Sequence, residues 1–213
     1  DDGNVAWKEY ARVIERVIEL NRTLPENGKI RVIAISRGYN FTGNEEVDAE
    51  LQVMLDAIHH ASDEGIFVIT TSTELNYDFF EAYGTDAPFA GLGKLDPLGD
   101  PDSPDTYTLG SWQWESAEMF EKSLLVPMDG RTTADMSGDT YVYYADGGWT
   151  VPYIAGVYAL CAGVDPDITP EAFYDAAVKT ATVITRSKEE GGKEYTFHMM
   201  NPPALISSLQ NNA

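Results

Sequence analysis

The sequence is poor in cations and in cysteine. Its 213 residues include 14 Lys and Arg against 35 Asp and Glu, which gives a net charge of −21. An acidic surface repels phosphate backbones and anionic lipid headgroups, so we expect neither a nucleic acid nor a membrane as partner. The single cysteine, Cys161, excludes an intrachain disulfide. Its apolar neighbours indicate a small buried side chain rather than a reactive thiol.

Long apolar runs are also missing. No segment approaches the ~20 apolar residues that a membrane helix requires, and the first residues show no signal-peptide pattern. The composition is nevertheless 43% hydrophobic and 11% aromatic, which is enough to bury one sizeable core. We therefore expect one domain over residues 1–213.

Helical and strand patterns alternate in the first third of the chain. A helical spacing over residues 7–18 precedes an apolar, β-branched run over 30–36. A second helical pattern over 47–61, ended by Gly65, precedes another apolar run over 66–71. The apolar positions of the first helix are Trp7, Tyr10, Val13, Ile14, Val17 and Ile18. This alternation is typical of an α/β sheet covered by helices.

The middle of the chain, residues 75–120, shows little periodicity. Asp96, Asp100, Asp102 and Asp105 are interleaved with Pro97, Pro101 and Pro104. This composition favours an extended, solvated loop. The alternative is a calcium site, but the spacing is not that of an EF-hand, and we expect no cofactor. Residues 107–112 could form a short strand.

Two later stretches carry helix signals. Turn-forming residues at 146–148 are followed by Pro152 and by small residues at helical spacing, which predict a tight turn and a closely packed buried helix. These small residues are Ala155, Gly156, Ala159 and Ala162. Further on, Thr169 and Pro170 predict a helix start, with Thr169 as the N-cap.

The segment over 146–156, DGGWTVPYIAG, resembles the nucleophile motif of the subtilisin-like serine peptidases (subtilases), GTSMAxPxVAG. Pro152, Ala155 and Gly156 match the motif, and Ile154 replaces its valine. The position of the nucleophilic serine is occupied by Gly148, which has no side chain to attack a carbonyl. The resemblance therefore implies a subtilase whose nucleophile position is altered.

Two upstream segments resemble the family in the right order. Ser36, Arg37 and Gly38 stand where the family has the S-x-G segment of its substrate cleft, with a cation in the usually apolar middle position. Residues 70–74 stand where it has A-A-A-G-N, which places Glu74 at the oxyanion-hole asparagine. An ionised glutamate accepts hydrogen bonds and repels an oxyanion, so this change opposes catalysis.

Three further segments extend the resemblance. Residues 124–130 resemble the family's D-V-x-A-P-G, residues 167–171 its L-T-P-E-x-V helix, and residues 200–206 its closing G-x-V-N-P-x-A-A. The resemblance implies a three-layer fold with a mostly parallel sheet and helices on both faces, of which the N-terminal part is absent. In that fold the strand matching 30–36 pairs with an upstream strand, so we expect one of its edges to lack a partner.

The catalytic Asp and His of the family belong to that upstream part. The histidines present are His59, His60 and His198, and their contexts indicate surface or packing roles. We therefore expect no catalytic residue in this chain. The sequence favours a catalytically inactive subtilisin-like homologue, or its C-terminal portion, with a binding or regulatory role.

The alternative is a serine-type endopeptidase completed by an upstream segment that carries Asp and His. Its nucleophile would then be Thr150, which lies two residues before Pro152, or a serine missing between Gly148 and Trp149. In either case the expected partner is the upstream part of the same protein, or a peptide or protein ligand. The resemblance implies an extracellular or cell-surface location. A nucleotide-binding domain is disfavoured, because neither G-x-G-x-x-G nor a P-loop follows the first strands.

Overall fold

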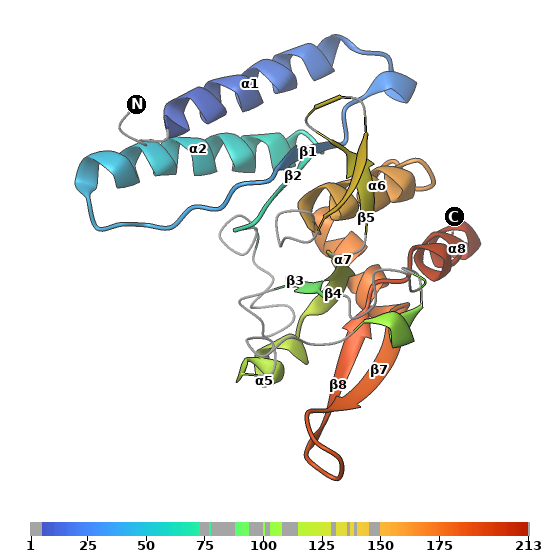
Figure 1. Ribbon diagram of the computed structural model, residues 1–213. Coiled ribbons are helices and arrows are strands. Elements are labelled where there is room, and N and C mark those ends of the chain that lie inside the picture. Colours follow the sequence, from blue (N-terminus) through green and yellow to red (C-terminus); the bar gives the residue numbers. More distant parts are fainter. Residues whose placement is uncertain are drawn as a thin grey trace.

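The computed structural model describes residues 6–72, 77, 88–93, 100, 103–107, 115–128, 131–135, 137–138, 140–144 and 150–212. In chain order the elements are α1 (Trp7–Thr23), η1 (Glu26–Gly28), β1 (Val32–Ile35), α2 (Glu45–Asp63), β2 (Phe67–Thr70), β3 (Phe89–Leu92), η3 (Pro104–Thr106), α5 (Ala117–Phe120), β4 (Leu124–Pro127), β5 (Arg131–Ala134), β6 (Tyr141–Tyr144), α6 (Thr150–Ala162), α7 (Pro170–Lys179), β7 (Thr182–Ser187), β8 (Glu194–Met199) and α8 (Pro202–Asn212) (Figure 1).

The strands form a mostly parallel arrangement. β1 and β2 pair in parallel, and a second sheet has the order β3-β4-β8-β7, in which only β7 and β8 are antiparallel. β5 and β6 form a separate antiparallel pair. Helix α6 contacts all of β1, β2, β3 and β4, so it connects the two sheets as a shared covering element. The predicted α/β class with a mostly parallel sheet is confirmed.

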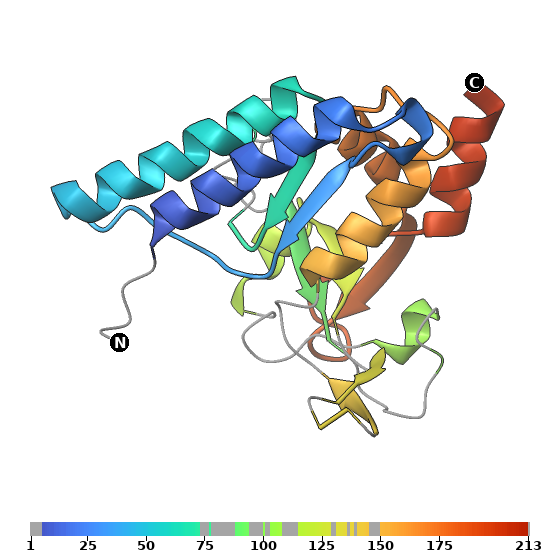
Figure 2. The same cartoon turned by 90° about the horizontal axis from the view of Figure 1, so that it is seen from above.

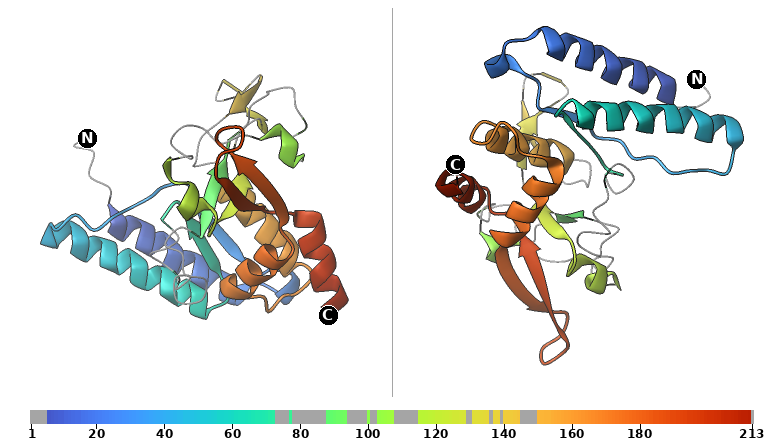
Figure 3. Two further views of the ribbon diagram at one scale, coloured as in Figure 1. Left: turned by 90° about the horizontal axis from the view of Figure 1, so that it is seen from below. Right: turned by 180° about the vertical axis from the view of Figure 1, so that it is seen from behind.

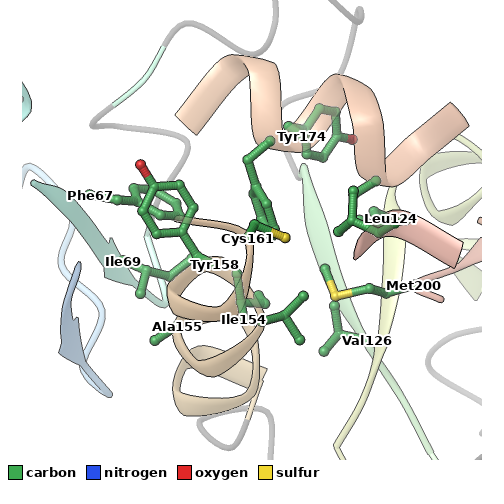
Figure 4. Packing of buried hydrophobic residues seen from close by; sticks show 14 of the residues in the cluster. Phe67, Ile69, Leu124, Val126, Ile154, Ala155, Tyr158, Cys161, Tyr174 and Met200 are labelled. Carbon is green, nitrogen blue, oxygen red and sulfur yellow. The ribbon is translucent and has the colours of Figure 1, made fainter. Parts of the chain in front are cut away.

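Helices lie on both faces of the β1–β2 sheet, as predicted. Successive side chains of a strand point to opposite faces, and β2 separates two cores in this way. Phe67 and Ile69 pack with α6, whereas Val68 packs with α1 and α2. Figure 4 shows Phe67 and Ile69 directed toward Tyr158 and Ala155 of α6. Figure 2 shows α1 and α2 together on one side of the strands and α6 on the other.

A third core lies on the other face of β4. Leu124 and Val126 point toward α6, while Leu125 packs against α5 and against Ile184 and Phe197 of the β7–β8 pair. This pair extends away from α1 and α2 (Figure 3). Within the described residues, no helix is both long and apolar enough to cross a membrane.

The helix ends follow from local sequence. Asn44 caps α2 by accepting from the N–H groups of Glu46 and Val47. At the other end Gly65 has a φ of 73°, its N–H donates to Ser62, and the next N–H donates to Ala61. These two bonds form a Schellman motif, so the predicted role of Gly65 is confirmed. The predicted N-cap of α7 is confirmed as well, because the Thr169 hydroxyl accepts from the Ala172 N–H.

Two packing predictions were wrong or incomplete, and one apolar position of the first helix lies at the surface. Val13, which belongs to the apolar pattern of α1, is 56% exposed. Helix α6 was predicted to be buried, but Gly156 and Ala159 are exposed while its opposite side is in the core. The run over 30–36 forms a strand only over Val32–Ile35. This strand is partly exposed, whereas β2 is fully buried.

Candidate site at the carboxyl ends of β1 and β2

The segment predicted to line a substrate cleft follows β1 directly. Ser36, Arg37 and Gly38 are all exposed. The Arg37 N–H donates to the Ile35 carbonyl over 2.6 Å, which turns the chain sharply at the end of the strand. The Arg37 carbonyl in turn accepts from the Thr71 N–H over 3.3 Å. The segment is therefore fixed against the carboxyl end of β2.

The buried residues Tyr39 and Ser72 hold the end of the turn that begins at residue 36. The Ser72 hydroxyl accepts from the Tyr39 N–H and donates to the Tyr39 carbonyl, both over 2.9 Å. Gly38 lies so close to the end of β2 that a Cβ there would be 2.6 Å from the Thr71 Oγ1 and 3.1 Å from the Ser72 Oγ. A Cβ at position 38 would therefore force the Thr71 side chain or the two strand ends to shift. Sequence reasoning missed the role of Ser72, because its partner lies 33 residues away.

Arg37 is directed toward α1. Its guanidinium carbon lies 5.8 Å from the centre of the Trp7 ring, and that ring contacts Tyr39 edge-on at a centroid distance of 5.6 Å. A guanidinium over an indole is held by the ring's electron-rich face. The sequence marked Trp7 only as an apolar position of a helical pattern, whereas the structure also places its ring against the Arg37 guanidinium.

The amino end of α6 lies toward the carboxyl ends of β1 and β2, where residues 36–38 are. An open pocket of about 760 Å³ is lined by residues 29–32 at the start of β1 and by Ala159, Ala162 and Gly163 at the end of α6. Since α6 also packs along β1, the helix runs opposite to the strand. Thr150, the half-buried first residue of α6, therefore lies toward residues 36–38. The positive end of a helix dipole at this place favours developing negative charge.

The two altered positions of the resemblance, Gly148 and Glu74, lie outside the described residues. So do Thr73, which precedes Glu74, and Trp149, which precedes α6. Their chemistry is known from the sequence alone.

The three histidines lie away from the carboxyl ends of β1 and β2. His60 is near the carboxyl end of α2, and its Nδ1 is 2.9 Å from a Glu15 oxygen while its Nε2 is 3.3 Å from Arg22. His59 is exposed beside it. His198 belongs to β8 and is paired with the first residue of β4. The expectation of surface and packing roles agrees with these positions.

Metal ligands are not gathered in the part of the chain that the structure describes, where no group of three His, Cys, Asp or Glu side chains could hold an ion. From the predicted acidic loop, Asp105 pairs with Arg186 at 3.0 Å. Asp96 and Asp102 lie outside the described residues, as does most of the short strand predicted over 107–112.

Comparison with solved structures identifies this architecture. The chain superposes on the prenylagaramide maturation protease PagA with a TM-score of 0.55 and 16% identity, covering 99% of this chain and 70% of that one. For the patellamide maturation protease PatA the TM-score is 0.54 with 17% identity, covering 99% and 72%. For the subtilase cytotoxin SubAB it is 0.58 with 14% identity, covering 95% and 65%.

The chain has the subtilisin-like fold. No protein-family model matches the sequence, and neither does any curated protein. At 14–17% identity the likeness concerns the architecture and not the reaction. The order of elements agrees with the fold that the resemblance implied, whereas the assignment of residues 36–38 and 70–74 to catalytic positions stays a prediction.

Proposed function

We propose that this chain is a subtilisin-like domain without peptidase activity that acts by binding a polypeptide. The observation that carries the proposal is Gly148, which stands four residues before Pro152 at the position of the nucleophilic serine. A glycine provides no atom that could form an acyl-enzyme. Glu74 at the oxyanion position adds a charge that opposes the transition state of peptide hydrolysis.

The described side chains offer no replacement for the catalytic base. A general base must lie within hydrogen-bonding reach of the nucleophile. All three histidines lie on α2 or β8, away from the end where Thr150 and residues 36–38 lie. The turn over residues 36–39 is nevertheless well fixed by Thr71 and Ser72. A fixed, exposed turn without catalytic groups is suited to binding rather than to hydrolysis.

The competing function is a serine-type endopeptidase completed by an upstream segment that supplies Asp and His. The observation in its favour is Thr150, a hydroxyl residue that starts α6 at this end of the sheet. Its position two residues before Pro152, instead of four, argues against it. The family resemblance also leads us to propose that the protein works outside the cell or at its surface, which fractionation of the native host would test.

Labelling and hydrolysis distinguish the two functions. We expect no reaction with a fluorophosphonate that labels active serine hydrolases, and no cleavage of a fluorogenic peptide panel. Mass spectrometry would identify any labelled residue. Specific labelling at Thr150, or turnover that is lost in Thr150→Ala, would overturn the proposal.

Restoring the hydroxyl provides a second test. We expect Gly148→Ser to remain inactive, because no histidine of the described residues lies at the site and because Glu74 remains. Hydrolysis by this single variant would contradict the inactive assignment.

A further inference from the structure

Two asparagines lie in the acceptor motif for an N-linked oligosaccharide, Asn-x-Ser/Thr with x other than proline. The motifs run from Asn21 to Thr23 and from Asn40 to Thr42. The motif is short and often occurs by chance, so it marks a site only where the folded chain has room for a large hydrated group. The structure distinguishes the two motifs, because Asn21 is buried and Asn40 is exposed.

Asn21 belongs to α1 and has no room for an oligosaccharide. The residue is 6% exposed, and its Nδ2 donates to the Ile30 carbonyl over 3.1 Å. A sugar on Nδ2 would lie in the contact between α1 and the segment that leads into β1. Because an oligosaccharide is bulky and hydrated, these two parts of the chain would have to separate to admit it. A chain modified at Asn21 therefore cannot reach the folded structure.

Asn40 lies at the surface, in the loop between β1 and α2 (Figure 1). The chain is fixed on both sides of it. The preceding residue, Tyr39, is held through its backbone by the Ser72 hydroxyl. Two residues after Asn40, the Thr42 N–H and hydroxyl both donate to an Asp48 oxygen, over 2.8 and 3.0 Å. An exposed asparagine between two fixed residues can carry an oligosaccharide without any change in the core.

The contacts of Thr42 also indicate when the modification takes place. The transferring enzyme requires the hydroxyl two residues after the acceptor, and in the folded chain this hydroxyl is bonded to Asp48. Transfer therefore precedes closure of the loop, while the chain is being exported. Both motifs are open to the enzyme at that stage, and folding then selects the chains in which Asn21 is unmodified.

An oligosaccharide on Asn40 would have two neighbours at the surface. The Phe41 side chain is 52% exposed, and a hydrated group on the adjacent residue would limit contacts of this apolar ring with other molecules. The exposed Gly38 lies two residues before Asn40. The oligosaccharide would therefore border the turn over residues 36–38 and restrict the size of a polypeptide that binds there.

We propose that Asn40 is an N-glycosylation site of the exported protein and that Asn21 remains unmodified in the folded chain. The donor is an oligosaccharide linked through its first sugar to a polyprenyl pyrophosphate. The bond between the anomeric carbon of that sugar and the pyrophosphate oxygen breaks, and a bond from the same carbon to the Asn40 Nδ2 forms. Nδ2 loses one proton, and the polyprenyl pyrophosphate leaves. This inference rests on the proposed location outside the cell.

The experiment places an export signal before the full chain and expresses it in a eukaryotic cell line that glycosylates its secreted proteins. The protein is treated with a peptide N-glycosidase in heavy-oxygen water, which converts a modified asparagine into a heavy-labelled aspartate that mass spectrometry detects. Asn40→Gln removes the acceptor, and Thr42→Ala removes its motif. The controls are Thr42→Ser, which keeps the motif, and Thr23→Ala, which removes the other motif but leaves the buried Asn21 amide in place.

We expect the secreted parent chain to carry an oligosaccharide at position 40 alone. Asn40→Gln and Thr42→Ala should lose the corresponding mass, whereas Thr42→Ser and Thr23→Ala should keep it. An unmodified Asn40, or an oligosaccharide on Asn21 in chains that unfold cooperatively in urea, would overturn the inference. Chains retained inside the cell are analysed in the same way, because transfer precedes folding, so poor secretion does not hide the result.

The result is independent of the tests of the proposed function. Fractionation of the native host tests the location, and the fluorophosphonate tests for peptidase activity. An intracellular native protein would contradict the proposed location, whereas an unmodified Asn40 in the exported chain would contradict only the glycosylation site.

Discussion

The side-chain amide of Asn21 bonds both backbone polar groups of Ile30. Its Nδ2 donates to the Ile30 carbonyl over 3.1 Å, and its Oδ1 accepts from the Ile30 N–H over 2.6 Å. Asn21 belongs to α1 and is 6% exposed, while Ile30 leads into β1. The Asn21 side chain thus offers Ile30 a donor and an acceptor, as a neighbouring strand would. It fixes α1 to the segment that leads into β1.

Replacing this amide should destabilise the fold. We expect Asn21→Ala to lower the free energy of unfolding by about 2–3 kcal/mol, because both polar groups of Ile30 lose their partner in a largely buried place. Urea denaturation measures the loss. Asn27→Ala, at an exposed position in η1, is the control and should change stability by less than about 0.5 kcal/mol. Equal effects of the two substitutions would contradict the assigned role.

The same substitution at two glycines should have opposite effects. Gly38→Ala would place a Cβ 2.6 Å from the Thr71 Oγ1, so we expect a loss of about 1–3 kcal/mol as the strand ends separate. Gly156→Ala adds a methyl group where nothing lies within 4 Å, inside a helix, so we expect a gain of about 0.4–1 kcal/mol. Thermal unfolding of both variants checks this. A stabilising Gly38→Ala would show that the strand ends lie further apart than described.

Stability should depend on pH through Asp48. Its pKa lies below the ordinary value mainly because its carboxylate accepts the Thr42 N–H. Desolvation opposes this effect, and the bonds from the Thr42 hydroxyl and the Gly43 N–H add to it. Because the pKa of Asp48 is lower in the folded state than in the unfolded state, its carboxylate stabilises the fold at pH values above the unfolded-state pKa of about 3.9. This stabilisation is lost as the pH falls through the folded-state pKa.

Asp48→Asn should therefore be less stable than the parent at pH 7, and the difference should shrink below about pH 4. Urea denaturation at several pH values measures both proteins. Asp63→Asn, near the exposed end of α2, serves as control. A difference that is constant between pH 7 and pH 2.5 would exclude titration of Asp48 as its cause.

Cys161 should be unreactive in the folded protein. Its side chain is fully buried in the core around α6, and burial raises the pKa of the thiol to about 11 (Figure 4). Because the thiolate is the reacting form, we expect no reaction with a disulfide reagent at pH 8 until urea unfolds the chain. Rapid labelling under native conditions would show that this core opens.

The sequence predicted helices and strands well where hydrophobic periodicity was strong. It predicted less well which faces of these elements are covered by other parts of the chain. The strand β2 and the capped helices α2 and α7 were found because their signals are local. The exposure of Val13 could not be predicted, because helical spacing shows which residues are apolar but not whether a neighbouring element covers them. The site depended on contacts such as Tyr39 to Ser72, which join distant segments and leave no periodic signal.

The hydrogen bond between Val68 and Tyr77 has a consequence for the order of folding. The Val68 N–H of β2 donates to the Tyr77 hydroxyl over 2.9 Å, only nine residues along the chain. The pairing of Leu124 with His198 instead spans 198 − 124 = 74 residues. A short loop closes at lower entropic cost, so we expect the Tyr77 contact to form early and the β4–β8 pairing late. In pulse-labelled hydrogen exchange during refolding, the Val68 amide should become protected before the amides of β8. Simultaneous protection would mean that both sheets assemble in one step.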